Sequence, residues 1–310
     1  MIQHQQSSGN LAADKRAGYA RLCAETLDYD VAIDVQKQAL ELAPYWATGW
    51  FCLGGYFEKT NDTASAQNAY AQALCFSPTD YLGAGLKIAY LAQSALNTVP
   101  IAYTEALFDG YADRFDGSLV QGLEYAAPER LAALLRENFG DRKFGKAIDL
   151  GCGTGLMAMQ VRDQIHNLTG VDLSAAMLAN ADAKRIYDTL IKRDAAEALM
   201  QCNNLDLVMA ADVFIYMASL ELVFKSASSS LVANGLFLFT VERHDGNERW
   251  QLLESMRHAH SANYVDHLLQ QFNFKIIAKE PGTIRNDGGT PVAGLFYLAQ
   301  KQFHGGTHAA

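Results

Sequence analysis

From residue 146 onward the chain alternates short apolar runs with stretches of helical periodicity, and this alternation limits its fold more than any other feature. Apolar runs bounded by turn residues are typical of buried strands, and the amphipathic stretches between them are typical of helices. A chain of this kind forms a mostly parallel sheet with helices on both faces, so we expect an α/β fold. The seven expected strands are residues 147–150, 168–172, 190–193, 206–210, 236–241, 275–279 and 293–299. The expected helices lie near residues 128–139, 156–165, 175–184, 195–201, 219–232 and 261–272.

The first expected strand ends in a glycine-rich turn. Residues 149–155 read DLGCGTG, with glycine at positions 151, 153 and 155. Glycines there turn the chain sharply and let a ligand lie against bare backbone, beside the N–H groups of the helix that follows. Asp172 ends the second expected strand, where a carboxylate can hold both hydroxyls of a ribose.

A dinucleotide-binding fold also has a glycine turn after its first strand, so the spacing has to separate the two ligand classes. The dinucleotide pattern is G-x-G-x-x-G, whereas here the third glycine comes one residue early and position 156 is leucine. This spacing disfavours a nicotinamide-dependent oxidoreductase, which stays an alternative because Asp172 fits both ligand classes.

The N-terminal third shows a different pattern, a register of 34 residues over positions 47–80. It resembles a tetratricopeptide repeat, with matching residues at Trp50, Leu53, Gly54, Phe57, Ala66, Tyr70, Ala73 and Pro78. A degraded copy precedes it at residues 13–46. The small residues Gly54 and Ala66 would let two antiparallel helices approach closely. We expect this module to dock a protein partner, and the alternative is that its helices only cap the next domain.

Length and pattern together predict two domains in the 310 residues. The expected divisions are a disordered tail at 1–12, a tetratricopeptide-like helical domain at 13–100, linker and lid helices at 101–145, a ligand-binding α/β domain at 146–302 and a tail at 303–310.

Composition excludes several classes of protein. The net charge of −9 and the lack of a Lys/Arg block argue against nucleic-acid binding. No apolar run is long enough to span a membrane, and residues 1–10 do not resemble a secretory signal. The 5 cysteines form no CxxC pair, so we expect reduced thiols, no metal site and a cytoplasmic location.

Five segments resemble motifs of the class I S-adenosylmethionine-dependent methyltransferases. They are DLGCGTG at 149–155, GVDLS at 170–174 followed by Met177, Asp194-Ala195, DLVMAADV at 206–213, and the segment 231–242. In the last segment Ala233 and Asn234 replace the family's usual Pro-Gly. The similarity is closer still to bacterial tetratricopeptide-containing methyltransferases, through FDGYADRFD at 108–116, LEY at 123–125, RHAHS at 257–261 and TPVAG at 290–294, although His258 stands at a position expected to be tyrosine.

The resemblance implies a Rossmann-like seven-stranded sheet and S-adenosylmethionine as the cofactor. It implies methyl transfer to a small-molecule, carrier-bound or protein acceptor; a cofactor-sensing scaffold without catalysis is the other alternative. The residues implied in cofactor binding are Asp149, Gly151, Cys152, Gly153, Gly155, Asp172, Leu173, Met177, Asp194, Ala195, Ala210 and Asp212.

The acceptor is expected over the carboxyl ends of the strands. Its expected contacts are Tyr111, Arg114, Phe115, Tyr216, Glu242 and His244. Tyr111 is also an expected catalytic residue, and Tyr111 and Phe115 could equally be packing residues. His260, with an ordinary pKa near neutrality, is the expected general base, and the competing interpretation is that it orients the helix beginning near Ser261. His258, His260 and His267 do not share a helical face suited to a metal.

Overall fold

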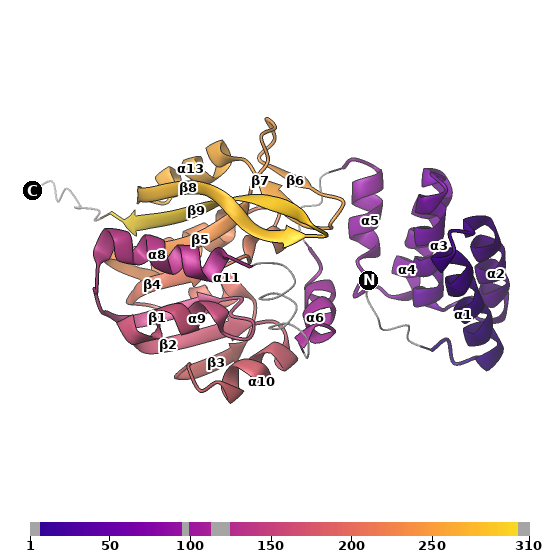
Figure 1. Ribbon diagram of the computed structural model, residues 1–310, viewed down its shortest axis with the longest axis horizontal. Helices are drawn as coiled ribbons and strands as arrows, with labels where there is room; N and C mark the ends of the chain where they lie inside the picture. The colour runs from indigo at the N-terminus through magenta and orange to yellow at the C-terminus, as the bar shows by residue number, and fades with distance from the viewer. Residues whose placement is uncertain (1–6, 95–98, 113–124, 303–310) are drawn as a thin grey trace, which may run out of the picture. The chain divides into compact units, whose positions relative to one another are not determined.

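The computed structural model describes residues 7–94, 99–112 and 125–302 (Figure 1). The chain divides into two compact units, Met1–Gly110 and Tyr111–Ala310. Each unit is described here by itself. None of the described helices is both long and apolar enough to cross a membrane.

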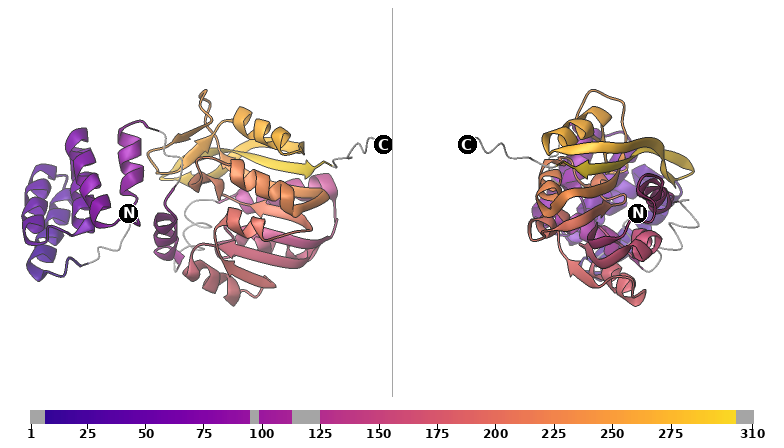
Figure 2. Two further views of the ribbon diagram at one scale, coloured as in Figure 1. Left: turned by 180° about the vertical axis from the view of Figure 1, so that it is seen from behind. Right: turned by 90° about the vertical axis from the view of Figure 1, so that its left-hand side faces the viewer.

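The N-terminal unit is helical, and its first five helices pack against one another in chain order (Figures 1 and 2). Its helices are α1 (Leu11–Glu25), α2 (Tyr29–Leu42), α3 (Ala47–Lys59), α4 (Thr63–Phe76), α5 (Ala84–Leu91) and α6 (Ile101–Asp109). Asn10 caps α1 by accepting hydrogen bonds from Ala12 N and Ala13 N. Helix α1 therefore begins at Leu11, two residues before the expected start of the helical domain at residue 13.

The backbone of this unit repeats after 34 residues, as the sequence register indicates. Leu27 and its counterpart Asn61 both have positive φ, at 65° and 59°. The next residues, Asp28 and Asp62, cap α2 and α4 through their carboxylates. The two helix pairs therefore start their second helix with the same turn and the same kind of cap.

Gly54 on α3 is needed for the close approach of α4. A Cβ atom at Gly54 would lie 2.7 Å from Tyr70 Cε1, well inside van der Waals contact. Tyr70 is buried, so its ring has little freedom to withdraw. The small residue that the repeat pattern places at position 54 thus makes room for an aromatic ring of the partner helix.

We expect Gly54→Ala to destabilise the protein by ~1–3 kcal/mol, because the added methyl overpacks the α3–α4 contact. Gly18→Ala on α1 is the matched control, since a Cβ there meets nothing within 4 Å. The control should be neutral or stabilising because alanine favours helices. Urea unfolding followed by circular dichroism measures both, and equal stability of the two variants would contradict the packing argument.

The C-terminal unit contains the expected seven-stranded, mostly parallel sheet. Its strands lie in the order β3-β2-β1-β4-β5-β9-β8, and β9 runs antiparallel to both of its neighbours, β5 and β8. The bounds are β1 (Phe144–Leu150), β2 (Ile165–Asp172), β3 (Thr189–Lys192), β4 (Leu205–Ala210), β5 (Leu231–Glu242), β8 (Phe274–Asp287) and β9 (Thr290–Lys301). The helices are α8 (Ala127–Phe139), α9 (Leu156–Val161), α10 (Ala175–Ala183), α11 (Ala195–Met200), α12 (Glu221–Ser230) and α13 (Ala262–Gln271).

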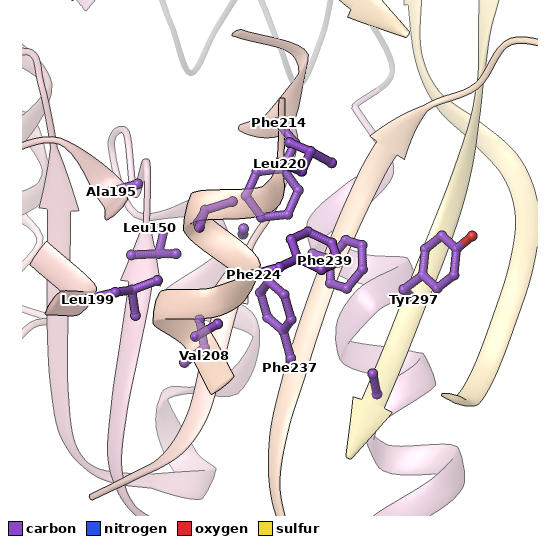
Figure 3. Packing of buried hydrophobic residues seen from close by; sticks show 14 of the residues in the cluster. Leu150, Ala195, Leu199, Val208, Phe214, Leu220, Phe224, Phe237, Phe239 and Tyr297 are labelled. Atoms are coloured by element: carbon purple, nitrogen blue, oxygen red, sulfur yellow. The ribbon is translucent and has the colours of Figure 1, made fainter. Parts of the chain in front are cut away.

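Helices cover both faces of the sheet, and alternate residues of β5 serve the two cores. Phe237 and Phe239 pack with α11, α12 and α13 on one face. Leu236 and Leu238 pack with α8 and α9 on the other. An aromatic cluster lies on the first face (Figure 3). In it the Phe239 ring stacks on the Tyr297 ring, with the ring centroids 5.0 Å apart. Because β5 is buried on both faces, its position in the sheet is fixed, and so are the positions of the neighbouring strand ends.

The C-terminal part of the unit differs from the sequence expectation. β8 and β9 are much longer than the apolar runs at 275–279 and 293–299, and they form a hairpin whose turn holds Gly288 and Gly289 at positive φ. A second small hairpin, β6 (Trp250–Leu252) with β7 (His258–His260), was not expected. The added strand residues are largely polar, so their hydropathy pattern did not indicate strands.

Candidate functional site

The candidate site lies at the carboxyl ends of β1, β2, β4 and β5. β1 sits between β2 and β4: the chain passes from β1 to β2 and β3 on one side, and then crosses back to β4 on the other side of β1. Such a reversal of strand order leaves a crevice beyond the carboxyl ends, where open parallel sheets bind ligands. The expected cofactor residues follow these strands in the chain.

The glycine turn after β1 has a backbone that favours glycine at all three positions, with φ of 58° at Gly151, 53° at Gly153 and 94° at Gly155. Neighbouring side chains of the same unit also leave no room for a Cβ atom at two of these glycines. A Cβ at Gly151 would lie 2.7 Å from Val213 Cγ2, and a Cβ at Gly155 would lie 2.5 Å from Ile186 Cδ1. The neighbouring side chains and the backbone conformation therefore both favour glycine in this turn.

Asp172, at the end of β2, joins the glycine turn to the next connection. Its Oδ2 accepts a hydrogen bond from Gly153 N and its Oδ1 accepts one from Ser174 N, both at 2.8 Å. The residue is 8% exposed. Each carboxylate oxygen can accept a further bond, so the oriented carboxylate suits a pair of neighbouring hydroxyls, as on a ribose.

Asp149 and Cys152 lie in or beside the same turn and are buried. Asp149 is 1% exposed, and burial, opposed by a hydrogen bond from Tyr187 and reinforced by the charge of Asp172, raises its pKa to about 7. Burial also raises the pKa of the Cys152 thiol well above its usual range. Cys152 is therefore a neutral thiol at physiological pH, unsuited to act as a nucleophile.

The expected adenine side is formed by the starts of α10 and α11. Asp194 caps α11, because its Oδ1 accepts hydrogen bonds from Ala196 N and Glu197 N. Ala195 is buried beside it, and Leu173 is half-buried. Met177 is fully buried, and its N donates to Ser174 Oγ at 3.1 Å.

A buried ion cluster stands at the ends of β4 and β5. Arg285, only 1% exposed, donates from one terminal nitrogen to both carboxylate oxygens of Asp212, at 2.6 and 2.7 Å. Its other terminal nitrogen donates to Glu242 Oε2 at 2.9 Å. Asp212 has a φ of 59°, unusual for a residue other than glycine, and its N donates to Thr240 Oγ1. Ala210, just before it, is fully buried.

A second arginine, Arg257, extends this cluster. It donates to Asp287 Oδ2 at 2.7 Å and hydrogen-bonds to Tyr216, whose pKa burial raises. The sequence had suggested Asp212, Tyr216 and Glu242 but neither arginine as a site residue. Arg285 reaches the cluster only because the β8–β9 hairpin runs on beyond the expected strands, toward the carboxyl edge of the parallel strands (Figure 1).

The remaining expected residues lie apart from these contacts or outside the described residues. His260 lies on β7, fully buried; burial lowers its pKa to about 4, and its Nε2 lies 3.0 Å from Ala218 O. His244 Nδ1 accepts from Gly246 N. Tyr111 is 40% exposed. Arg114 and Phe115 fall outside the described residues. No group of three or more His, Cys, Asp or Glu side chains suited to a metal occurs in the described ranges.

We expect Arg285→Met to destabilise the protein by about 3–5 kcal/mol at pH 8, because two buried carboxylates lose their counter-charge. The loss should shrink as pH falls and Glu242, whose pKa burial raises, becomes protonated, since a neutral carboxyl group needs no cation. Thermal melting from pH 5 to pH 8 measures this dependence.

Arg243→Met is the matched control, because Arg243 pairs with Asp245 at the surface. That exposed pair should contribute less than about 1 kcal/mol. An Arg285→Met penalty that does not change with pH would contradict the assignment of Arg285 as the counter-ion of both carboxylates.

Residues 148–239 match the family model described as "Methyltransferase domain". Malonyl-[acyl-carrier protein] O-methyltransferases of Enterobacter lignolyticus and Bacillus cereus are similar to this chain, with identities of 27% and 24%. The matches cover 42% and 43% of this chain. The chain spans about half the length of these relatives, 53% and 52%.

Among solved structures, the 1,6-didemethyltoxoflavin-N1-methyltransferase of Burkholderia thailandensis, with bound S-adenosylhomocysteine, superposes with a TM-score of 0.54 at 19% identity. The match covers 68% of this chain and 93% of that one, and it shows a shared fold. These comparisons support neither the nicotinamide-dependent oxidoreductase nor the non-catalytic scaffold. The C-terminal unit therefore has the fold of that S-adenosylmethionine-dependent methyltransferase, and residues 148–239 within it match the methyltransferase-domain model.

Proposed function

We propose that this protein transfers the methyl group of S-adenosylmethionine to a small molecule, or to a group bound to a carrier or protein. The observation that carries the proposal is the Asp172 carboxylate, held by the N–H groups of Gly153 and Ser174 beside the glycine turn. Its placement at the crevice fits the ribose of the cofactor. The names of the relatives and of the Burkholderia enzyme include an oxygen and a nitrogen methylation, so the proposal extends to both acceptor atoms.

The cofactor supplies a methyl group on a sulfonium, an activated leaving group, so this chain has no need of a covalent intermediate. Its task is to hold the cofactor and acceptor in line and to exclude water. In this proposal the backbone of the glycine turn cradles the cofactor and Asp172 accepts from the ribose hydroxyls. Leu173 and Met177 flank adenine, and Asp194 accepts from the adenine amino group beside Ala195. Asp149, Ala210 and Asp212 surround the methionyl end.

The acceptor would lie at the ends of β4 and β5, where the Arg285 cluster gathers polar groups. Tyr216 and Glu242 belong to that cluster, and His244 and Tyr111 are further candidate contacts. His260 is neutral at pH 7, which is the form that a general base requires. A base role for it requires an opening of the structure, because His260 has no exposed surface.

Replacing Asp172 tests the proposal directly. We expect Asp172→Ala to weaken S-adenosylmethionine and S-adenosylhomocysteine binding by roughly 100-fold, because hydrogen bonds to a charged group contribute ~1.5–3 kcal/mol each. Isothermal titration calorimetry, with NADH as the control ligand, measures this. Asp163→Ala is the matched control, since Asp163 is an exposed aspartate that pairs with Arg136 away from the turn.

The outcomes separate the function classes. Unchanged cofactor affinity in Asp172→Ala would refute the assignment of the ribose site. Binding of NADH alone would favour the oxidoreductase. Binding of S-adenosylmethionine with no turnover across broad acceptor panels would favour the cofactor-sensing scaffold.

For the N-terminal unit, we propose a tetratricopeptide-like docking role toward a protein that presents the acceptor. The 34-residue repeat and a groove of about 670 Å³, lined by α2, α3 and α4 and including Lys37, Trp50 and Phe57, support it. A cytoplasmic location is part of the proposal, because all 5 cysteines are free thiols.

Trp50→Ala should reduce capture of a partner by the full-length chain by tenfold or more, since buried aromatic anchors carry much of the energy of such interfaces (about 2 kcal/mol or more). Affinity capture with quantitative mass spectrometry measures the change. Tyr19→Ala, an exposed position on α1 outside the groove, is the control. Identical captured sets from wild type and Trp50→Ala would contradict docking in this groove.

A further inference from the structure

Tyr187, in the connection between α10 and β3, is half-buried and packs against the glycine turn. Its ring occupies the space left by two glycines: a Cβ at Gly155 would lie 3.1 Å from Tyr187 Cε2, and a Cβ at Gly170 would lie 2.9 Å from Cδ1. The ring therefore packs between the turn after β1 and strand β2. Nothing in the sequence analysis or in the comparisons gives this tyrosine a role.

The hydroxyl of Tyr187 has a separate contact. It donates a hydrogen bond to Asp149 Oδ2 at 2.7 Å. This hydrogen bond favours the charged form of Asp149. The ring and the hydroxyl thus do different things: the ring fills space, and the hydroxyl orients a buried carboxylate.

The surroundings of Asp149 make that single bond important. The groups that face it are Tyr187, the like-charged Asp172, the neutral thiol of Cys152 and, farther off, the Tyr125 hydroxyl. Burial and Asp172 disfavour its charged form, whereas the Tyr187 hydroxyl favours it. With a pKa raised to about 7, Asp149 changes charge near physiological pH, and the loss of the hydroxyl would shift the balance further toward the neutral acid.

We propose that Tyr187 is a positioning residue for cofactor binding: its hydroxyl holds the Asp149 carboxylate, in its charged form, in place for the amino group of S-adenosylmethionine. The inference rests on the proposed function, since it concerns the methionyl end of the same site. A carboxylate attracts an ammonium group, and a neutral carboxyl group does not. Cofactor affinity therefore falls as pH decreases through the range in which Asp149 takes up its proton.

Tyr187→Phe tests this, because phenylalanine keeps the ring between Gly155 and Gly170 and removes only the hydroxyl. Calorimetric titration with S-adenosylmethionine and S-adenosylhomocysteine from pH 6 to pH 9 gives the affinity profile. We expect the midpoint of the wild-type profile to move upward by about 1 pH unit in Tyr187→Phe, with about fivefold weaker binding at pH 7. The two proteins should converge near pH 9. Asp149→Asn should lose the inflection.

Tyr297→Phe is the matched control. Tyr297 is another tyrosine whose hydroxyl donates to an aspartate, Asp266, at 2.9 Å, but it is buried on β9 away from the turn. Its removal should leave the affinity profile unchanged. Titration of the ligand's own amino group affects all four proteins equally, so differences between them report on the chain.

A second measurement needs no cofactor. Carbon-13 NMR of labelled aspartate carboxyl groups, with the Asp149 signal assigned by its loss in Asp149→Asn, follows the titration of Asp149 directly. Tyr187→Phe should raise its midpoint. If the wild-type chain bound no S-adenosylmethionine, the proposed function would fail while this titration still tested the coupling. An unmoved midpoint, or weakening of binding by one factor at every pH, would overturn the role of the hydroxyl.

Discussion

The functional end of the C-terminal unit depends on one carboxylate that is bonded on both sides. Asp172 ends β2 and accepts N–H groups from the turn after β1 and from the start of its own next connection. A buried carboxylate is costly unless it accepts hydrogen bonds, and here two backbone N–H groups supply one to each oxygen. In the proposed function the same group that ties the two connections together also holds the ribose. The Gly153 contact joins Asp172 to a turn whose glycines have positive φ.

The other end of the crevice is organised differently, by charge pairing between distant segments. Arg285 lies on β8, whereas Asp212 and Glu242 follow β4 and end β5. Removing water from three charges is favourable only when geometry is good, and the short contacts of Arg285 supply it. The C-terminal hairpin is thereby tied to the ends of the parallel strands. Arg257 and Arg285 both lie beyond residues 148–239, the part that matches the methyltransferase-domain model.

The sequence predicted those features whose cause is local. The glycine turn, the acid after β2 and the alternation of strands and helices each depend on residues near in the chain, and the seven-stranded sheet was confirmed. The 34-residue period of the helices was visible for the same reason. Arg285 and Tyr187 were missed because their partners lie 73 and 38 residues away. Polar strand residues such as those of β8 carry no apolar alternation, so neither the long hairpin nor its arginine could be predicted from periodicity.

The glycines of the turn show why a motif can be recognised correctly for an incomplete reason. From the sequence, these glycines were expected to allow close approach by a ligand. In the structure, Val213 lies where a side chain at Gly151 would go, and Ile186 and Tyr187 do so at Gly155. Two of the three glycines are thus required from the protein side even before any cofactor is considered. A substitution at Gly155 would displace the ring of Tyr187, and with it the hydroxyl that orients Asp149, so loss of cofactor binding in such a variant would not by itself show contact between the glycine and the cofactor.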